Sequence, residues 1–369
     1  MILPSRRNLV RTVEWNGRTA VRKLFNDPAD WQRELDLLRL LGGRIPAPGV
    51  LVAAPGILLT EYLPHPTLLD ELERQEREGF SPAPWLALRQ WIERVCALTG
   101  LLPGDGNLRN FLWDGSRIHG LDFEGYAQGA PAGSLAQIAA YILEYHPRDT
   151  LVKRRAARCL FDGSADAARL SLIERRRKKA DSPPELSFIL LAGGKSTRMG
   201  RDKASLPFFG TSLLQLQLDK ARLMGCGDIL ISGADHSADG AKTVPDVYPD
   251  RGPLGGLHAC LREAKHTNCI VLGADMPLLP PCELRALARE HASSGAEITL
   301  AVHSERWEPL AGVYNSALAD RIAPMIEHSG APVRALIQKS DCRFRQSPLS
   351  EEFWINCNTP EAYASITGG

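Results

Sequence analysis

The sequence predicts a two-domain α/β protein, and three observations lead to that fold class. The chain has 369 residues, which is enough for two domains of ~150 residues each. Short apolar runs alternate with amphipathic helical patterns after residue 185, which indicates a mainly parallel sheet with helices on both faces. A charged stretch ends in Pro183-Pro184 and is typical of an interdomain linker. We therefore expect one domain over residues 1–180 and a second over 185–369.

The elements of the second domain follow from its apolar runs. We expect strands where those runs are short and bounded by turn residues, and helices where apolar residues recur at helical spacing. In such sheets, ligands bind beyond the carboxyl ends of the strands. The expected strands are 186–191, 228–232, 269–273, 298–302 and 310–314, and the expected helices are 213–224, 257–264, 282–291 and 317–326.

Composition excludes several classes of function. The chain is 44% hydrophobic and 24% charged with a net charge of +1, so nothing in its overall charge favours binding to nucleic acid or to an anionic membrane. It contains no run of ~18 apolar residues, and no apolar segment of a signal peptide follows its early arginines. The eight cysteines form no C-x-x-C pair, which favours small buried residues in a reducing compartment. We expect a cytoplasmic protein without nucleic-acid or membrane partners.

The turn after the first of these strands carries the strongest signal. Residues 191–203 read Leu-Ala-Gly-Gly-Lys-Ser-Thr-Arg-Met-Gly-Arg-Asp-Lys. Glycine lets backbone N–H groups approach a phosphate closely, and Arg198 and Lys203 add positive charge there. The spacing fits neither a Walker A loop nor a G-x-G-x-x-G fingerprint. The segment therefore predicts a nucleoside triphosphate site of another kind.

A second strand end supplies a carboxylate. Asp275 follows an apolar run and precedes Met276-Pro277, which places it on a short, rigid turn. Mg²⁺ is usually bound by one or two carboxylates together with substrate phosphates. We therefore expect Asp275 to hold Mg²⁺ close to the glycine-rich turn.

These motifs, in this order, resemble the MobA-like nucleotidyltransferases over almost the whole second domain. Those enzymes transfer a nucleoside monophosphate from a nucleoside triphosphate to a phosphorylated acceptor. The Ala-Gly-Gly form of the turn is similar to that of the molybdenum cofactor guanylyltransferases, which implies GTP and molybdopterin as substrates. The resemblance also implies nucleotide contacts from Leu191, Ala192, Gly193, Gly194, Lys203, Asp246 and Gly252, a catalytic role for Arg198, Lys203 and Asp275, and a metal-binding role for Asp275 and Asn358.

Two of these assignments leave alternatives open. Asp250 lies nearer than Asp246 to the glycines that follow, and the sequence does not decide which carboxylate points inward. Asn358 precedes Thr359-Pro360-Glu361, which also makes a good helix N-terminus.

The first domain carries a different pattern. Asp105 precedes Asn110 by five residues, and a short apolar run then ends in Asp122-Phe123. This resembles kinase-like phosphotransferases of the lipopolysaccharide-kinase and aminoglycoside-phosphotransferase types, and implies an α+β domain that binds ATP. By that resemblance Asp105 accepts the hydroxyl proton, Asn110 and Asp122 hold Mg²⁺, Lys23 is the strand lysine with Glu34 as its partner, and residues 58–63 form the hinge strand.

The first domain also departs from that family. Pro103 stands where histidine is usual, and residues 1–15 contain no glycine for a phosphate-covering loop. An inactive kinase-like module therefore remains an alternative. For the whole chain, two further alternatives stay open: a small-alcohol kinase joined to a cytidylyltransferase that makes a CDP-activated metabolite, and a nucleotide-binding scaffold without activity.

Overall fold

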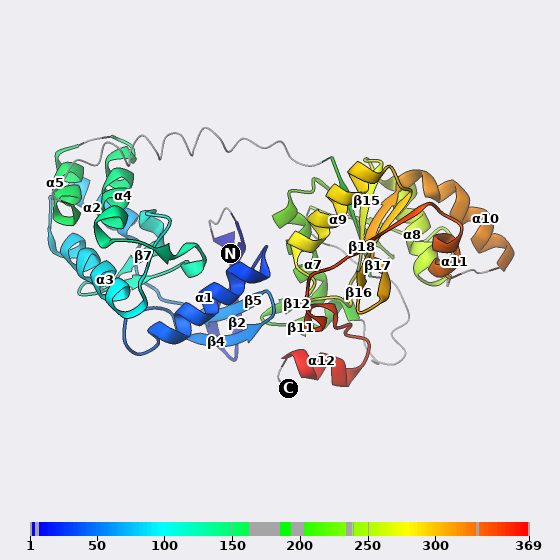
Figure 1. Cartoon of the computed structure of the whole chain (residues 1–369), viewed down its shortest axis with the longest axis horizontal. Coiled ribbons are helices and arrows are strands. Elements are labelled where there is room, and N and C mark those ends of the chain that lie inside the picture. Colours follow the sequence, from blue (N-terminus) through cyan, green and yellow to red (C-terminus); the bar gives the residue numbers. More distant parts are fainter. Residues whose placement is uncertain are drawn as a thin grey trace. The chain divides into compact units, whose positions relative to one another are not determined.

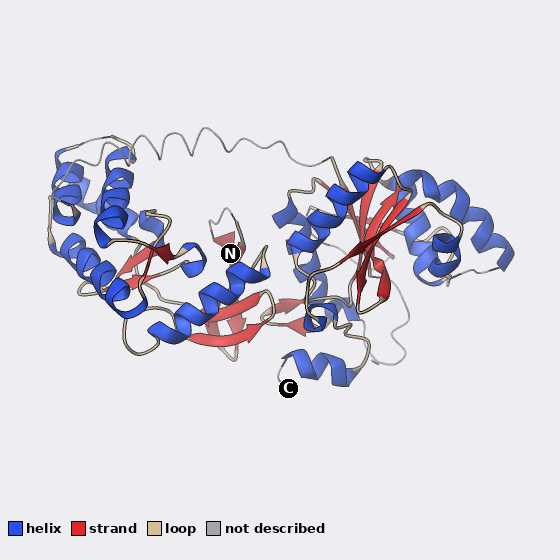
Figure 2. Cartoon of the chain, viewed as in Figure 1, coloured by secondary structure: helices blue, strands red, loops and turns tan. Residues whose placement is uncertain are grey.

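The structure is a computed structural model that describes residues 2–3, 7–148, 150–161, 185–192, 203–233, 238, 240–249, 251–329 and 332–367. The chain divides into two compact units (Figures 1 and 2). The first contains Met1–Pro28, Ala54–Leu59 and Ser182–Gly369, and the second contains Ala29–Ala53 and Thr60–Asp181. The first unit thus joins the start of the chain to its C-terminal half. The expected domains 1–180 and 185–369 stay a prediction.

A seven-stranded sheet forms the centre of the first unit. Strand β10 pairs in parallel with β13 and β15, β13 pairs in parallel with β14, and β16 does so with β18. Only β17 among these seven runs antiparallel to its neighbours. The mixed α/β architecture with a mostly parallel sheet is therefore confirmed for this half. The strands in sheet order are β14 (Lys242–Val244), β13 (Asp228–Ser232), β10 (Ser187–Leu191), β15 (Asn268–Gly273), β17 (Arg306–Asn315), β16 (Ile298–His303) and β18 (Cys342–Gln346).

Helices cover both faces of this sheet because its central strands are apolar on both sides. In β10, Phe188 and Leu190 belong to one core cluster, while Ile189 and Leu191 belong to another, as expected when successive side chains point to opposite faces. The first cluster includes α7 (Leu213–Met224) and α9 (Pro281–Ser294). The second includes α8 (Gly252–Glu263), α10 (Ala319–Ser329) and α11 (Val333–Gln338) (Figure 1).

Some elements begin where the sequence predicts and others do not. Helix α7 has the predicted bounds because Ser212 caps its N-terminus and Gly225, at φ 81°, ends it. Helix α8 begins at Gly252, five residues before the prediction, because Pro253 suits a first turn although the glycines lower helix propensity. Strand β17 begins at Arg306 because pairing with β16 extends it through polar residues.

The N-terminal residues form a five-stranded sheet in the order β1-β2-β3-β5-β4. Its hairpin turns at Asn16-Gly17, where both residues have positive φ, as a tight two-residue turn requires. The predicted hinge strand overlaps β5. These strands are β1 (Ile2–Leu3), β2 (Leu9–Trp15), β3 (Arg18–Leu24), β4 (Val50–Ala54) and β5 (Ile57–Glu61).

The second unit is mainly helical. Its core includes Trp85, whose indole N–H donates to Gln75 Oε1 at 3.0 Å. The helices are α1 (Pro28–Leu41), α2 (Leu68–Glu78), α3 (Ala83–Thr99), α4 (Pro131–Glu144) and α5 (Leu151–Leu160), and the short strands are β6 (Leu101–Leu102), β7 (Phe111–Trp113), β8 (Ile118–Gly120) and β9 (Ala127–Gln128).

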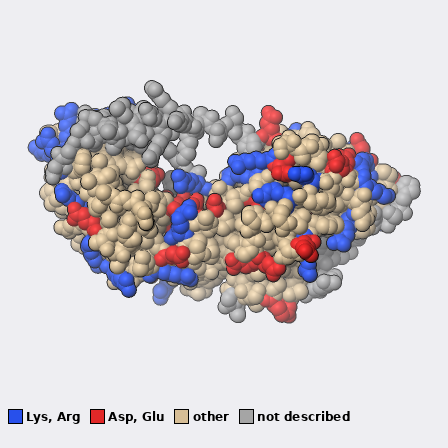
Figure 3. Space-filling model, in the orientation of Figure 1, with Lys and Arg blue, Asp and Glu red and all other residues tan. Residues whose placement is uncertain are grey.

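The described part of the first unit also contains β11 (Pro207–Phe208), β12 (Thr211–Ser212) and α12 (Pro360–Thr367). Within the described parts of the chain, no helix has the length and apolarity needed to cross a bilayer. Basic and acidic side chains are interspersed on the face drawn in Figure 3.

Candidate functional site

The carboxyl ends of β10, β13 and β15 meet at one edge of the central sheet. The Ala192 N–H donates to Ser232 Oγ at the end of β13, at 3.2 Å. The Ala274 N–H donates to the Leu191 carbonyl at 3.1 Å. Leu191 and Ala192, the first two residues of the predicted nucleotide turn, therefore lie beside the turn that carries Asp275. Gly193, Gly194 and Arg198 lie outside the described residues, as does the side chain of Lys203.

The backbone around Asp275 leaves room for its carboxylate. A Cβ placed on Gly273 would lie 2.5 Å from Asp275 Oδ1, so the glycine admits the carboxylate in this position over the strand end. The Asp275 carbonyl accepts a hydrogen bond from the Cys357 N–H at 2.8 Å. Asn358 is the next residue, so the two predicted metal ligands come from segments that are hydrogen-bonded to each other.

Helix α7 supports the Asp275 turn from the protein interior. Gln217 Nε2 donates to the carbonyls of Gly273 at 3.3 Å and Met276 at 3.0 Å. Lys220 Nζ donates to the carbonyls of Met276 at 3.1 Å and Pro277 at 2.7 Å. The Lys220 side chain is fully buried, and burial lowers the pKa of its ammonium well below the usual range.

Gln217 and Lys220 are not among the site residues predicted from the sequence. Their signal is visible in retrospect, because two polar residues spaced i, i+3 interrupt the apolar positions of a predicted helix. Such residues on a buried face need hydrogen-bond partners, and these partners come from a loop 56 or more positions away.

Asp246 lies against the first turns of α8. A Cβ on Gly256 would be 3.4 Å from Asp246 Oδ1 and 2.8 Å from the Cβ of Ser232, so the glycine admits both side chains against the helix backbone. Among the described residues Asp246 Oδ1 is buried without a hydrogen-bond partner, and burial raises the pKa of this carboxyl. Gly252 opens the helix at φ 64°, a conformation that favours glycine.

Ser232 links these parts into one site. Its hydroxyl accepts the Ala192 N–H, and its Cβ lies beside Gly256, the glycine that the Asp246 carboxylate also approaches. Ser232 is likewise absent from the site residues predicted from the sequence. Asp250, the alternative to Asp246, lies outside the described residues.

Comparison with known proteins assigns this half of the chain to a family. A model of the MobA-like NTP transferase domain matches residues 188–346. The molybdenum cofactor guanylyltransferase of Xanthomonas euvesicatoria pv. vesicatoria is 32% identical over 186 residues, which are 48% of this chain and 92% of that protein. The chain belongs to the MobA-like family. The enzyme of the same name from Rhizobium meliloti is 32% identical over 189 residues, which are 47% of this chain and 86% of that protein.

The MobA-like domain confirms the resemblance drawn from the C-terminal motifs and makes the chain a nucleotidyltransferase by family. A hollow of about 710 Å³ is lined by the end of β16 and the start of β17 and reaches Ile355, three residues before Asn358. The rings of His303 and Trp354 stack at 4.5 Å in its lining. The remaining lining residues are Ser304, Arg306, Glu351 and Glu352.

Outside the MobA-like domain, the second unit brings the predicted kinase-like loops together. The Asn110 carbonyl accepts the Leu121 N–H at 2.8 Å, beside Asp122, which has φ 60°. Gly104, next to the exposed Asp105, packs so closely on the Gly125 carbonyl that a Cβ would clash. Ligand atoms of Glu34, Asp122 and Glu124 lie within 4.8 Å of one another.

The structure does not test the kinase-like roles. Lys23 is buried on β3 and belongs to the first unit, whereas Glu34 belongs to the second. The family match covers only the C-terminal half. Phosphotransfer by Asp105, metal binding by Asn110 and Asp122, and ATP binding near Lys23 therefore stay predictions.

Proposed function

We propose that this chain transfers GMP from GTP to molybdopterin and releases pyrophosphate. Membership in the MobA-like family supports nucleotidyl transfer, and the names of the relatives support this nucleotide and acceptor. One observation carries the proposal. Two backbone hydrogen bonds, Ala274 N–H to the Leu191 carbonyl and Cys357 N–H to the Asp275 carbonyl, gather three separated motifs at one edge of the sheet.

The reaction requires mainly that the two substrates are positioned and that the charge of their phosphates is neutralised. A phosphate oxygen of the acceptor attacks the α-phosphorus of GTP and forms a new P–O bond. The bond from that phosphorus to the bridging oxygen breaks, and its electron pair leaves with pyrophosphate. In this proposal the amides of Gly193 and Gly194 and the cations of Arg198 and Lys203 bind the triphosphate.

We assign the metal site to Asp275 and Asn358. A carboxylate and a side-chain amide offer the hard oxygen ligands that Mg²⁺ prefers. The residues fit that ion because Gly273 leaves room for the carboxylate and the Cys357 N–H fixes the neighbouring segment. When bound there, Mg²⁺ supplies charge neutralisation at the phosphates.

Asp246 is the proposed contact to the nucleoside. Its buried Oδ1 has no hydrogen-bond partner among the described residues, and a carboxylate in that state gains from an N–H or O–H donor of a ligand. Guanine offers two adjacent donors, N1–H and N2–H, whereas cytosine offers one amino group. This chemistry favours GTP over CTP.

The deciding measurement is pyrophosphate release by the full chain with each nucleotide and each acceptor. We expect release with GTP and molybdopterin in the presence of Mg²⁺, and little with CTP and a phosphorylated alcohol. The opposite preference would favour the CDP-metabolite alternative. Nucleotide binding without acceptor-dependent release would instead indicate an inactive scaffold.

A further inference from the structure

Helix α7 bears polar contacts on two different faces. Gln217 and Lys220 point to the Asp275 turn. Asp219 immediately precedes Lys220 and is therefore rotated by about 100° around the helix axis. It faces the N-terminal hairpin β2–β3, which belongs to the same compact unit although it precedes α7 by about two hundred positions.

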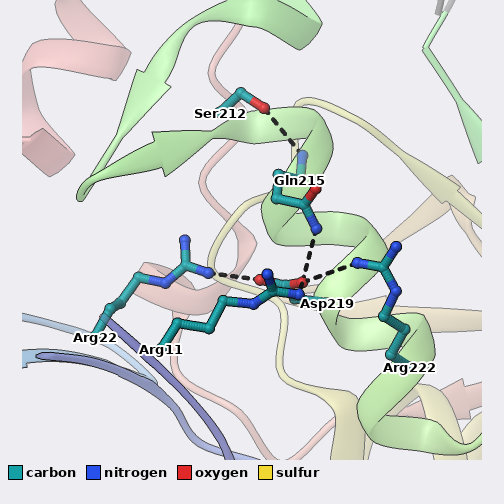
Figure 4. Close-up of polar contacts among 6 residues, drawn as sticks. All are labelled: Arg11, Arg22, Ser212, Gln215, Asp219 and Arg222. Atoms are coloured by element: carbon teal, nitrogen blue, oxygen red, sulfur yellow. Dashed lines mark hydrogen bonds and ion pairs between the residues drawn. The ribbon is translucent and has the colours of Figure 1, made fainter. Parts of the chain in front are cut away.

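Two arginines of the hairpin bind the Asp219 carboxylate (Figure 4). Arg11 Nη2 lies 2.6 Å from Oδ1, and Arg22 Nη2 lies 2.5 Å from Oδ2. The side chain of Asp219 is 0% exposed, that of Arg22 is 1% exposed and that of Arg11 is 20% exposed. Little water therefore screens these ion pairs, in contrast to pairs at a protein surface.

The hairpin needs this carboxylate. Arg11 and Arg22 are directly opposite each other in the β2–β3 register, and like charges in that position destabilise a strand pair. One carboxylate between them offsets part of this repulsion. Within α7, Gln215 Nε2 also donates to Asp219 at 2.8 Å and Arg222 Nη1 lies 3.3 Å away, so the carboxylate is held from the helix side as well.

Apolar and backbone contacts also join the N-terminal segment to the C-terminal half of the same unit. The Gly210 position would not accept a Cβ, which would lie 2.6 Å from Val13. The rings of Trp15 and Phe209 are 6.1 Å apart. The Asn26 carbonyl accepts the Cys282 N–H at 3.0 Å. The hairpin is thus packed on the transferase half by shape as well as by charge.

We propose that the β2–β3 hairpin is a positioning element of the nucleotidyltransferase, and that Arg11 and Arg22 act on the reaction through Asp219 and α7. The arginines fix Asp219, Asp219 fixes the rotation of α7, and Gln217 and Lys220 on that helix hold the carbonyls of the turn that carries Asp275. This inference rests on the proposed function. It makes the transfer site depend on residues far before the MobA-like domain.

The test compares Arg22→Met and Arg11→Met with Arg345→Met in the full chain. Arg345 pairs at 2.5 Å with Glu283, whose side chain is 3% exposed, and this pair involves neither α7 nor the Asp275 turn. Three quantities are measured below the unfolding temperature of every variant: kcat, KM for GTP, and hydrogen exchange at the amides of residues 268–276. Arg11→Met is the milder change and serves if Arg22→Met does not fold.

We expect the hairpin variants to lower kcat by about ten- to a hundredfold, because small displacements of a reacting site cost that much, and to leave KM for GTP within about threefold. Amide exchange at Met276 should become faster. Arg345→Met should lower the unfolding temperature without changing kcat or this exchange. Arg22→Lys, which keeps the charge, should recover most of the kcat lost in Arg22→Met.

Folded hairpin variants with kcat within twofold of the parent and unchanged exchange at Met276 would overturn the inference. The same holds if Arg345→Met lowers kcat as much as they do. If the parent releases no pyrophosphate with GTP and molybdopterin, the proposed function fails by itself. In that case, amide exchange at Met276 in the hairpin variants still shows whether the hairpin positions the turn that carries Asp275.

Discussion

Two carboxylates at the strand edge differ in what surrounds them. Asp275 sits over Gly273 on a turn whose backbone is hydrogen-bonded to Leu191 and Cys357. Asp246 is packed against α8, and its Oδ1 is buried without a partner among the described residues. The first arrangement suits a carboxylate held in place for a metal ion. The second arrangement suits a carboxylate that receives its missing hydrogen bond from a bound ligand.

The first residue-scale prediction concerns Asp275→Asn. The amide keeps the shape but removes the negative charge that attracts Mg²⁺, so we expect kcat for pyrophosphate release to fall by about a thousandfold or more. Circular dichroism should stay unchanged. Glu290→Gln, on the outer side of α9, is the matched control and should retain activity. Turnover of Asp275→Asn within tenfold of the parent would rule out the metal role.

The second residue-scale prediction concerns Asp246→Asn and pH. Burial raises the pKa of this carboxyl in the folded state, so its contribution to stability is present below the unfolded pKa and is lost as pH rises through the folded pKa. At pH 7 the charged carboxylate therefore costs stability. The asparagine variant should unfold about 1–2 °C higher than the parent at pH 7, a small effect because the group is only partly buried.

That gain should shrink as pH falls through the raised folded pKa of the Asp246 carboxyl, because protonation then removes the charge that burial disfavours. GTP affinity should fall in the same variant, since the proposed nucleoside contact is lost. Thermal unfolding across the pH range and a GTP titration measure both effects. An asparagine variant less stable than the parent throughout this pH range would contradict the assignment.

At the scale of elements, α7 does more than cover the sheet. Its apolar residues Leu218, Ala221 and Met224 pack in the core, while Gln217 and Lys220 satisfy backbone carbonyls of the Asp275 turn. A buried carbonyl left without a donor costs about 1–3 kcal/mol. The helix therefore fixes the conformation of the turn that it underlies.

The element-scale prediction is that Lys220→Met lowers both stability and kcat. Methionine is similar in length but cannot donate to Met276 and Pro277, so the free energy of unfolding should fall by about 1–3 kcal/mol and kcat by about tenfold or more. Denaturant titration and initial rates measure these changes. Lys265→Met, at an exposed lysine of the same unit, should change neither. An unaltered kcat in folded Lys220→Met would show that the turn needs no support from α7.

At the scale of the whole molecule, the first unit combines segments from the start of the sequence with segments from its C-terminal half. The hairpin lies within residues 1–28, and the transferase sheet begins at Ser187. The relatives cover 47–48% of this chain, and the family model matches residues 188–346. The additional N-terminal residues nevertheless contact both helices, since Arg22 of β3 binds Asp219 of α7 and the Asn26 carbonyl accepts the Cys282 N–H of α9.

The whole-molecule prediction is that residues 185–369 alone are less stable and less active than the full chain. Removing the hairpin exposes Phe209 and leaves Asp219 without Arg11 and Arg22, so the unfolding temperature should fall by several degrees. Calorimetry and pyrophosphate release compare the two chains at equal concentration. A shortened chain with the stability and turnover of the full one would show that the hairpin contributes nothing to the transferase.

The sequence by itself determined much of the transferase half. Local signals were sufficient for α7 and β13, whose predicted bounds match the observed ones, because capping residues and short apolar runs act over a few positions. The order of the motifs was sufficient to predict the family. The ends of β10 and β15 were predicted to meet because parallel strands bring their carboxyl ends to one edge.

Tertiary structure decided the contacts that join distant residues. The start of α8, the roles of Ser232, Gln217 and Lys220, and the pairing of Arg11 and Arg22 with Asp219 all depend on partners far away in the chain. A local pattern marks a buried polar side chain as needing a partner but does not name that partner. Only folding brings the two groups within hydrogen-bond distance, because burial makes an unpaired polar or charged group costly.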